Sequence, residues 1–265
     1  MPQNMRLKII STVDAENNAI FRKTKDALVA ELEKDASIIL TDENPDIVHI
    51  IGAWNASSVK TANDAIKRYI ALVYTPLGSL SPWYKPASSH VKLATKATAT
   101  VASGAMEQEL LSGQEKKNLH LILNAVTTAT TTPEEMADGY KAIYKDAIET
   151  TDITLWNEVD RRIKMVNEQD KCILEICRNL LYAKYLYQRR NIPHKFLDKL
   201  VALMTDSNYN EDTMVEILKF IRLDVFTQHL EYVMMEKSGL TEGFMPIIYK
   251  QDKVSDKMLD LVTDY

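Results

Sequence analysis

The chain has 265 residues, 46% of them apolar, and a formal net charge of −5, which allows one large domain or two small ones with packed cores. The negative charge argues against nucleic-acid binding, and five scattered histidines without paired spacing argue against a histidine-built metal site. No run approaches 18 consecutive apolar residues, so we expect no transmembrane segment.

The first half of the chain alternates short apolar runs with segments of helical spacing. Strands are expected at residues 7–13, 36–40, 46–52, 70–74, 98–103 and 119–126. Helices are expected between them, at residues 18–34, 57–68, 88–95 and 104–111. Strands that alternate with helices form crossovers and a parallel sheet, and nearly continuous apolar strands indicate a sheet covered on both faces. We therefore predict an α/β fold, with a parallel, Rossmann-like sheet in residues 1–126.

The second half of the chain has a different pattern. A polar, threonine-rich linker begins at residue 127, and Thr132 followed by Pro133 is a typical helix start. From there on we expect no strand. Helices are expected from residue 133 and at residues 154–190, 194–204, 211–237 and 255–262. Residues 127–265 therefore predict an all-helical domain, and its amphipathic helices are candidates for binding a protein partner or a second copy of the chain.

The two cysteines, Cys172 and Cys177, fall in one expected helix. Five residues apart, they point to different faces of that helix, so we expect no disulfide bond between them. The N-terminal stretch lacks the apolar core and the cleavage site of a signal peptide. Both observations favour a reducing, cytoplasmic location.

The clearest motif follows the apolar run at residues 70–74. That run leads directly into residues 75–84, T-P-L-G-S-L-S-P-W-Y, a turn-rich loop with a Ser-Pro helix start. Open α/β sheets bind ligands where such loops follow the carboxyl ends of strands, so we expect a ligand-binding cleft there. The candidate ligand-binding residues are Asp14, His49, Trp54, Asn55, Leu77, Gly78, Ser79 and Trp83.

Most of these candidates have a structural alternative. His49 is either a substrate-binding imidazole or a satisfied histidine near the core. The glycine and serine of the loop either present amides and hydroxyls to a ligand or form a turn before a helix. Trp54 and Trp83 either stack on a sugar ring or pack among loop residues. Asp14 is either an acid or base near the end of the first strand or part of a solvated loop. No catalytic group can be assigned from the sequence.

Four phrases, in this order, carry a resemblance to a known family. Residues 46–54, DIVHIIGAW, look like a D-I-V-H-x-H-G segment, and residues 75–84 match a T-P-x-G loop. Residues 102–111 are similar to a strand followed by a serine and an acidic helix, and residues 121–126, LILNAV, resemble I-P-N-G-V. Over residues 6–126 the chain thus resembles the N-terminal, acceptor-side Rossmann-like domain of GT-B glycosyltransferases of the glycogen-synthase-like, family 4 type.

The resemblance implies a glycosyltransferase-like protein of surface or capsular glycan synthesis, with a glycan acceptor. Several residues depart from the family pattern, however. The first loop carries Asp14 and Glu16 where the family has glycines, Leu77 replaces a basic or imidazole side chain, and Ile51 replaces the second histidine. Helices follow where the family has a second Rossmann domain for the donor, and Lys250 stands where a motif glutamate would lie. We therefore expect no cofactor and weak nucleotide-sugar binding at most.

Three functions of different classes remain open. The first is a glycosyltransferase-type protein that depends on a second chain for its donor site. The second is a non-catalytic relative that binds a glycan or regulates a true transferase. The third is an interaction or scaffold protein whose helical half binds another protein or itself. The resemblance favours the first two, and the long amphipathic helices favour the third.

Overall fold

A computed structural model describes residues 4–12, 19–113 and 118–264 of the chain. The residues group into two compact units, Met1–Asp152 and Ile153–Tyr265, which we call the sheet unit and the helical unit. Among the described residues, no helix is both long enough and apolar enough to cross a membrane.

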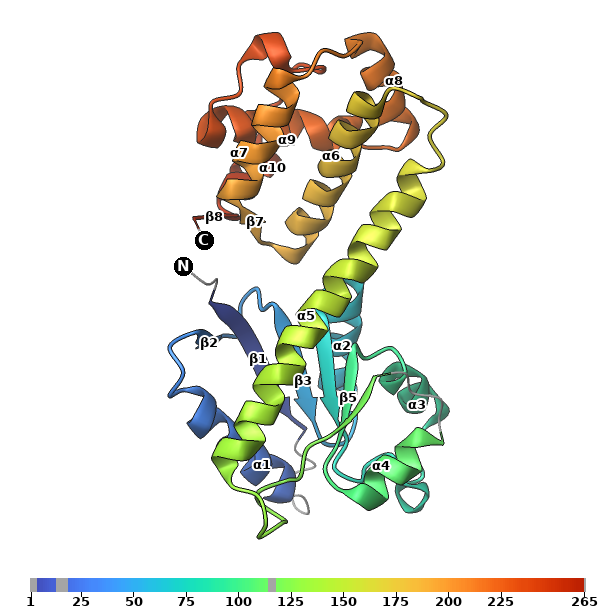
Figure 1. Ribbon diagram of the computed structural model, residues 1–265, viewed down its shortest axis with the longest axis vertical. Coiled ribbons are helices and arrows are strands. Elements are labelled where there is room, and N and C mark those ends of the chain that lie inside the picture. Colours follow the sequence, from blue (N-terminus) through green and yellow to red (C-terminus); the bar gives the residue numbers. More distant parts are fainter. Residues whose placement is uncertain (1–3, 13–18, 114–117, 265) are drawn as a thin grey trace. The chain divides into compact units, whose positions relative to one another are not determined.

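The sheet unit is built on one parallel sheet (Figure 1). Its strands are β1 (Met5–Ser11), β2 (Ile38–Leu40), β3 (Ile47–Ile51), β4 (Ala71–Thr75), β5 (Ala99–Ala102) and β6 (Leu119–Leu121). They lie side by side in the order β2-β1-β3-β4-β5-β6, and every neighbouring pair is parallel. This arrangement confirms the predicted α/β fold with a Rossmann-like sheet.

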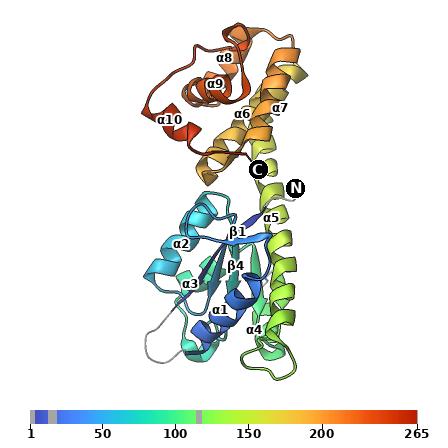
Figure 2. The same cartoon turned by 90° about the vertical axis from the view of Figure 1, so that its left-hand side faces the viewer.

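Helices cover both faces of the sheet, as the apolar strands require. One face packs against α1 (Ala19–Leu32) and the first part of α5 (Pro133–Ile163). The other face packs against α2 (Ala56–Lys67), α3 (Ser88–Ala94) and α4 (Ala105–Ser112). Figure 2 shows α2 and α5 on opposite sides of the strands. Successive residues of one strand serve the two cores: Ile47 and Ile51 of β3 face α1 and α5, whereas Val48 and Ile50 face α2.

The sheet unit extends beyond the boundary that the sequence suggested at residue 126. The first twenty residues of α5 belong to it, because the unit ends only at Asp152. Met136, Tyr140 and Tyr144 of this helix are almost fully buried in the core of the sheet. The polar start of α5 concealed this face, since its apolar residues alternate with acidic and basic ones.

The helical unit contains the rest of α5 and five further α-helices among its described residues. These are α6 (Lys171–Arg189), α7 (His194–Asp206), α8 (Glu211–Phe220), α9 (Asp224–Ser238) and α10 (Lys253–Leu259). A short 3-10 turn, Glu242–Phe244, lies between α9 and α10. The unit confirms the all-helical prediction except for one minor element: β7 (Ile192–Pro193) and β8 (Val262–Thr263) form a two-residue parallel pair.

Two helices that the sequence predicted as continuous are interrupted. The expected helix at residues 154–190 ends with α5 at Ile163, and α6 begins afresh where the Asp170 carboxylate caps it by accepting from the Cys172 amide at 2.8 Å. The expected helix at residues 211–237 breaks at Arg222, which has a left-handed φ of 58°. Neither break carries the glycine or proline that would have revealed it.

Candidate functional site at the carboxyl edge of the sheet

Strands β1, β3, β4 and β5 end at one edge of the sheet, which we call the carboxyl edge. The chain leaves β1 toward β2 and leaves β3 toward β4, in the opposite direction, so the topology switches between these two strands. Such a switch point is where open α/β sheets bind ligands. Of the predicted residues, Asp14 lies outside the described part of the chain. The other seven are described.

The end of β3 is closely packed by protein. Gly52 has a φ of +101°, and its amide donates to the Thr75 carbonyl at 2.8 Å. A Cβ atom at Gly52 would lie only 2.5 Å from the ring of Phe21, which projects from α1 and is buried. Glycine is therefore required here by both conformation and space. The apolar Phe21 ring fills the position beside the switch point.

Trp54 and Asn55, which follow Gly52, serve the fold in the described structure. The Trp54 ring is 7% exposed and stacks on Tyr74 with 4.3 Å between ring centroids. Asn55 caps α2: its side chain accepts from the Ser58 amide at 2.9 Å, and the Ser58 hydroxyl accepts from the Asn55 amide at 2.8 Å. The indole Nε1 of Trp54 is buried without a hydrogen-bond partner among the described residues.

The loop after β4, residues 76–87, contains three more of the predicted residues. Leu77 and Gly78 both have left-handed backbones, with φ of 49° and 83°. Leu77 packs against the core on the α1 face. Ser79 is buried, and its hydroxyl lies 3.2 Å from the Gly52 carbonyl and 3.1 Å from the Tyr74 hydroxyl. These contacts support the alternative in which the loop glycine and serine shape a turn.

Glu107 on α4 is a site residue that the sequence reading missed. Its carboxylate accepts three hydrogen bonds: from the Gly78 amide at 2.6 Å, the Ser103 amide at 2.7 Å and the Ser103 hydroxyl at 2.6 Å. The carboxylate thus joins the loop after β4 to the end of β5. A serine four residues before an acid at a helix start was visible in the sequence, but the bond to Gly78, 29 residues away, was not.

The loop after β4 carries two exposed aromatic side chains. Trp83 and Tyr84 lie on a 3-10 turn, Pro82–Tyr84, and are 68% and 50% exposed. Trp83 was predicted, whereas Tyr84 was missed. Met106 on the first turn of α4, next to Glu107, is 78% exposed. Trp83 and Tyr84, two neighbouring exposed aromatic side chains, are therefore the candidates for contact with a ligand or partner.

His49 lies inside the sheet unit, away from solvent. It is fully buried on β3, with Nδ1 2.7 Å from the Tyr144 hydroxyl and Nε2 2.9 Å from the Thr75 hydroxyl. The Thr75 hydroxyl also lies 2.9 Å from the Tyr140 hydroxyl. Burial lowers the pKa of His49 from 6.5 to about 3, so the ring is neutral at physiological pH. The structure therefore supports the satisfied core histidine over the substrate-binding imidazole.

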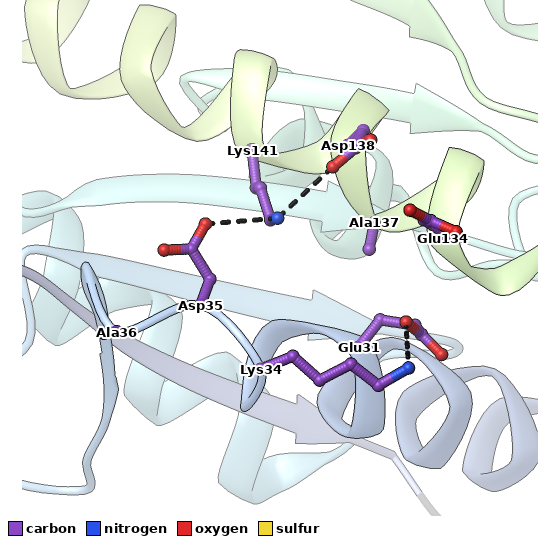
Figure 3. A pocket seen from close by; sticks show the side chains of 8 residues that line it. All are labelled: Glu31, Lys34, Asp35, Ala36, Glu134, Ala137, Asp138 and Lys141. Carbon is purple, nitrogen blue, oxygen red and sulfur yellow. Dashed lines mark hydrogen bonds and ion pairs between the residues drawn. The ribbon is translucent and has the colours of Figure 1, made fainter.

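A separate pocket of about 300 Å³ lies between the C-terminal end of α1 and the start of α5 (Figure 3). Lys141 points into it and pairs with Asp35 at 3.1 Å and with Asp138 at 3.2 Å. Hydrogen bonds from Ser37, with a smaller effect of Lys141, lower the pKa of Asp35 to about 2. Asp35 precedes β2, so this residue lies at the opposite end of that strand from the carboxyl edge. None of the seven described site residues lines the pocket.

Among the described residues, no cluster of three or more His, Cys, Asp or Glu side chains is placed to hold a metal ion. Comparison with protein-family models gives no match, and neither the curated proteins nor the solved structures include a significant match to the chain. The resemblance to GT-B glycosyltransferases therefore remains a prediction from the residues that carry it.

Proposed function

We propose that this protein is a glycosyltransferase-like protein of surface or capsular glycan synthesis that binds a glycan acceptor at the carboxyl edge of its sheet. The observation that carries the proposal is the exposed pair Trp83 and Tyr84, held on the loop after β4 at the edge where α/β sheets bind ligands. Aromatic rings offer a flat apolar face with a polar rim, which suits the C–H face and the hydroxyls of a sugar.

The donor is the part of the reaction that this chain supports least. The amides of Gly78 and Ser103, which could serve a phosphate, already donate to the Glu107 carboxylate. A diphosphate approaching this edge would meet a negative charge. The described residues of the helical unit form helices and one two-residue strand pair, with no second Rossmann-like sheet among them. The donor site therefore has to come from outside these residues, and we assign it to a partner protein.

The proposed location is the cytoplasm, where nucleotide sugars are made and where the two cysteines stay reduced. Both Cys172 and Cys177 are free thiols in the structure. Burial raises the pKa of the Cys177 thiol to about 12, so that side chain acts as a small apolar group of the core.

Calorimetric titration with a panel of capsular oligosaccharides tests the acceptor site. We expect the wild-type protein to bind at least one glycan, and Trp83→Ala to weaken that binding by about tenfold or more, since one lost stacking contact is worth about 1 to 2 kcal/mol. Phe220→Ala is the matched control, because Phe220 is an aromatic of similar exposure, 66%, in the helical unit. Its glycan affinity should equal that of the wild type.

The same titrations test the donor side. Nucleotide diphosphates and their sugars should bind with dissociation constants near or above about 1 mM, with or without magnesium. Low-micromolar binding of a nucleotide sugar would show that the chain binds a donor without a partner protein, and would contradict this part of the proposal. Failure of every glycan to bind, or equal binding by Trp83→Ala, would contradict the acceptor site.

A scaffold role is the second candidate, and exposed apolar side chains on the helical unit favour it. Phe220 and Val225, on either side of the turn between α8 and α9, are 66% and 57% exposed. Such side chains suit a protein partner or a second copy of the chain. Light scattering of the wild-type protein distinguishes the second copy: a monomer at high micromolar concentration rules out self-association, and a dimer that Phe220→Ser dissociates supports it.

A further inference from the structure

We infer that Glu107 is a positioning residue, which fixes the loop after β4 and so orders Trp83 and Tyr84 for ligand binding. The inference rests on the proposed function for its ligand, but its structural content concerns the loop itself. Nothing in the sequence resemblance assigns a role to this side chain.

The contacts of Glu107 join two separate crossovers of the sheet. One oxygen accepts from the Gly78 amide, in the loop after β4, at 2.6 Å. The other accepts from the amide and the hydroxyl of Ser103, at the end of β5, at 2.7 and 2.6 Å. Hydrogen bonds to an ionised carboxylate are short and about twice as strong as neutral ones. One side chain therefore supplies three strong bonds to two loops at the carboxyl edge.

Helix capping explains only part of this arrangement. Glu107 occupies the third position of α4, where an acid commonly folds back to the amide of the N-cap residue. The N-cap residue here is Gly104, but the carboxylate bonds to Ser103 and to the more distant Gly78 instead. The bond to Gly78 does nothing for α4. Its effect is on the loop.

The loop needs such a restraint. Leu77 and Gly78 are successive residues with left-handed backbones, and this conformation is unfavourable for leucine because of its Cβ atom. Strained backbone of this kind persists only where the surroundings hold it. On the inner side, the buried Ser79 hydroxyl and the core side chains of Leu77 and Leu80 hold the loop, and on the other side Glu107 holds the Gly78 amide. Trp83 follows five residues after Gly78, so we expect loss of the Glu107 bonds to loosen the exposed segment that carries it.

Four variants test the inference. Glu107→Ala removes all three acceptor contacts, and Glu107→Gln keeps one acceptor oxygen, which can serve Gly78 or Ser103 but not both. Ser103→Ala removes only a hydroxyl donor and leaves the bond to Gly78. Glu109→Ala is the matched control, since Glu109 is an exposed acid of the same helix and its removal changes the net charge equally.

Amide hydrogen exchange and 15N relaxation give readouts that need no ligand. In Glu107→Ala we expect the Gly78 amide to exchange about tenfold or more faster, and the backbone order parameter of Trp83 to fall from about 0.85 toward 0.6. Exchange in β3 and β4 should stay as in the wild type, which shows that the sheet is intact. The Gly78 exchange rate and the Trp83 order parameter of Glu107→Gln should lie between those of the wild type and Glu107→Ala. Both values in Glu109→Ala should match the wild type.

Glycan titration then links the loop to binding. Glu107→Ala should weaken glycan binding about tenfold, while Ser103→Ala and Glu109→Ala change it less than about threefold. Unchanged Gly78 exchange or unchanged Trp83 order in Glu107→Ala overturns the inference, whatever happens to binding. Full glycan affinity in a variant whose loop is disordered overturns the positioning role as well. If the wild type binds no glycan, the proposed function fails, and the order of Trp83 alone decides whether Glu107 holds the loop.

Discussion

Two fully buried side chains, His49 in the sheet unit and Glu231 in the helical unit, are accommodated in opposite ways. In the sheet unit, His49 is fully buried and both ring nitrogens have hydroxyl partners on β4 and α5. In the helical unit, Glu231 on α9 is also fully buried, but neither carboxyl oxygen makes a hydrogen bond within the described residues. The Thr227 hydroxyl, one turn earlier on α9, is buried and unpaired as well.

The difference shows that equal burial has unequal consequences. The His49 contacts connect β3, β4 and α5, so this polar group helps to specify how α5 lies on the sheet. The Ile247 amide lies near Glu231 and opposes the rise in its pKa, but its geometry does not make it a hydrogen-bond partner of either carboxyl oxygen. Desolvation is therefore left largely uncompensated, and it raises the pKa of Glu231 to about 9. Both groups are neutral at pH 7, but one is a structural connection and the other is a cost to stability.

The pH dependence of stability should therefore have opposite signs in the two units. The folded pKa of His49 lies below its ordinary value of 6.5, so its contribution is present above pH 6.5 and is lost as the pH falls toward 3. The folded pKa of Glu231 lies above its ordinary value of 4.5, so its contribution is present below pH 4.5 and is lost as the pH rises toward 9. The variants below isolate each effect.

The largest expected effect is that of Glu231→Gln on the helical unit. Between pH 5 and pH 8 the wild-type unit should lose up to about 4 kcal/mol of unfolding free energy relative to the variant, since each pH unit costs at most about 1.4 kcal/mol. Hydrogen exchange of α9 peptides, measured across this range, gives the free energy of opening. Glu236→Gln, an exposed acid on the same helix, should leave the wild-type pH profile unchanged. If the free energy of opening changes with pH in the same way in the wild type and in Glu231→Gln, the contrast between Glu231 and His49 is wrong.

The second expected effect is the loss of stability in the sheet unit on His49→Ala. The substitution leaves a cavity and removes the partner of the Tyr144 and Thr75 hydroxyls, so we expect a loss of about 3 kcal/mol at pH 7. Exchange of β3 and β4 amides measures it. His90→Ala is the control: His90 on α3 is half-buried and has no side-chain hydrogen bond in the described structure, so it should cost less than about 0.5 kcal/mol. Equal losses for the two variants would contradict the network.

The fold could be predicted because the strands of the sheet are local signals. Apolar runs such as residues 70–74 predict buried strands. The helices expected between these runs imply that the strands are parallel. The breaks at residues 164–170 and at Arg222 could not be predicted, because a carboxylate cap and a left-handed arginine resemble ordinary helix residues. Local patterns thus identify elements well and their ends poorly.

The candidate site was predicted less completely, and for a physical reason. The loop after β4 was located by its turn residues, but the contacts that decide its role come from afar in the sequence. Glu107 reaches Gly78 across 29 residues, and Tyr144 reaches His49 across 95. The second contact also explains why the unit boundary was placed too early, since α5 looks like part of the helical half until its tyrosines are seen in the core of the sheet.

The smallest predicted effects are the losses of stability caused by removing the hydroxyl of Tyr144 or of Tyr140. They test whether the hydrogen bonds of His49 are what distinguishes it from Glu231. Tyr144→Phe keeps the ring that packs edge-on against His49, with centroids 5.7 Å apart, but removes the hydroxyl that contacts Nδ1. One ring nitrogen is then buried without a partner, as the Glu231 oxygens are, so we expect a loss of about 1 to 2 kcal/mol.

Tyr140→Phe should cost less than Tyr144→Phe, because it removes a contact to Thr75 and leaves both ring nitrogens of His49 paired. Burial raises the pKa of both tyrosines, so both are neutral hydroxyls, and the Tyr144 hydroxyl can donate to Nδ1 while Nε2–H donates to Thr75.

The 15N shifts of His49 should then show protonated Nε2 in the wild type. If Nδ1 carries the proton instead, the Tyr144 hydroxyl is an acceptor and must place its own proton elsewhere. Removing that hydroxyl would then relieve a buried donor, and the two phenylalanine variants would lose similar stability.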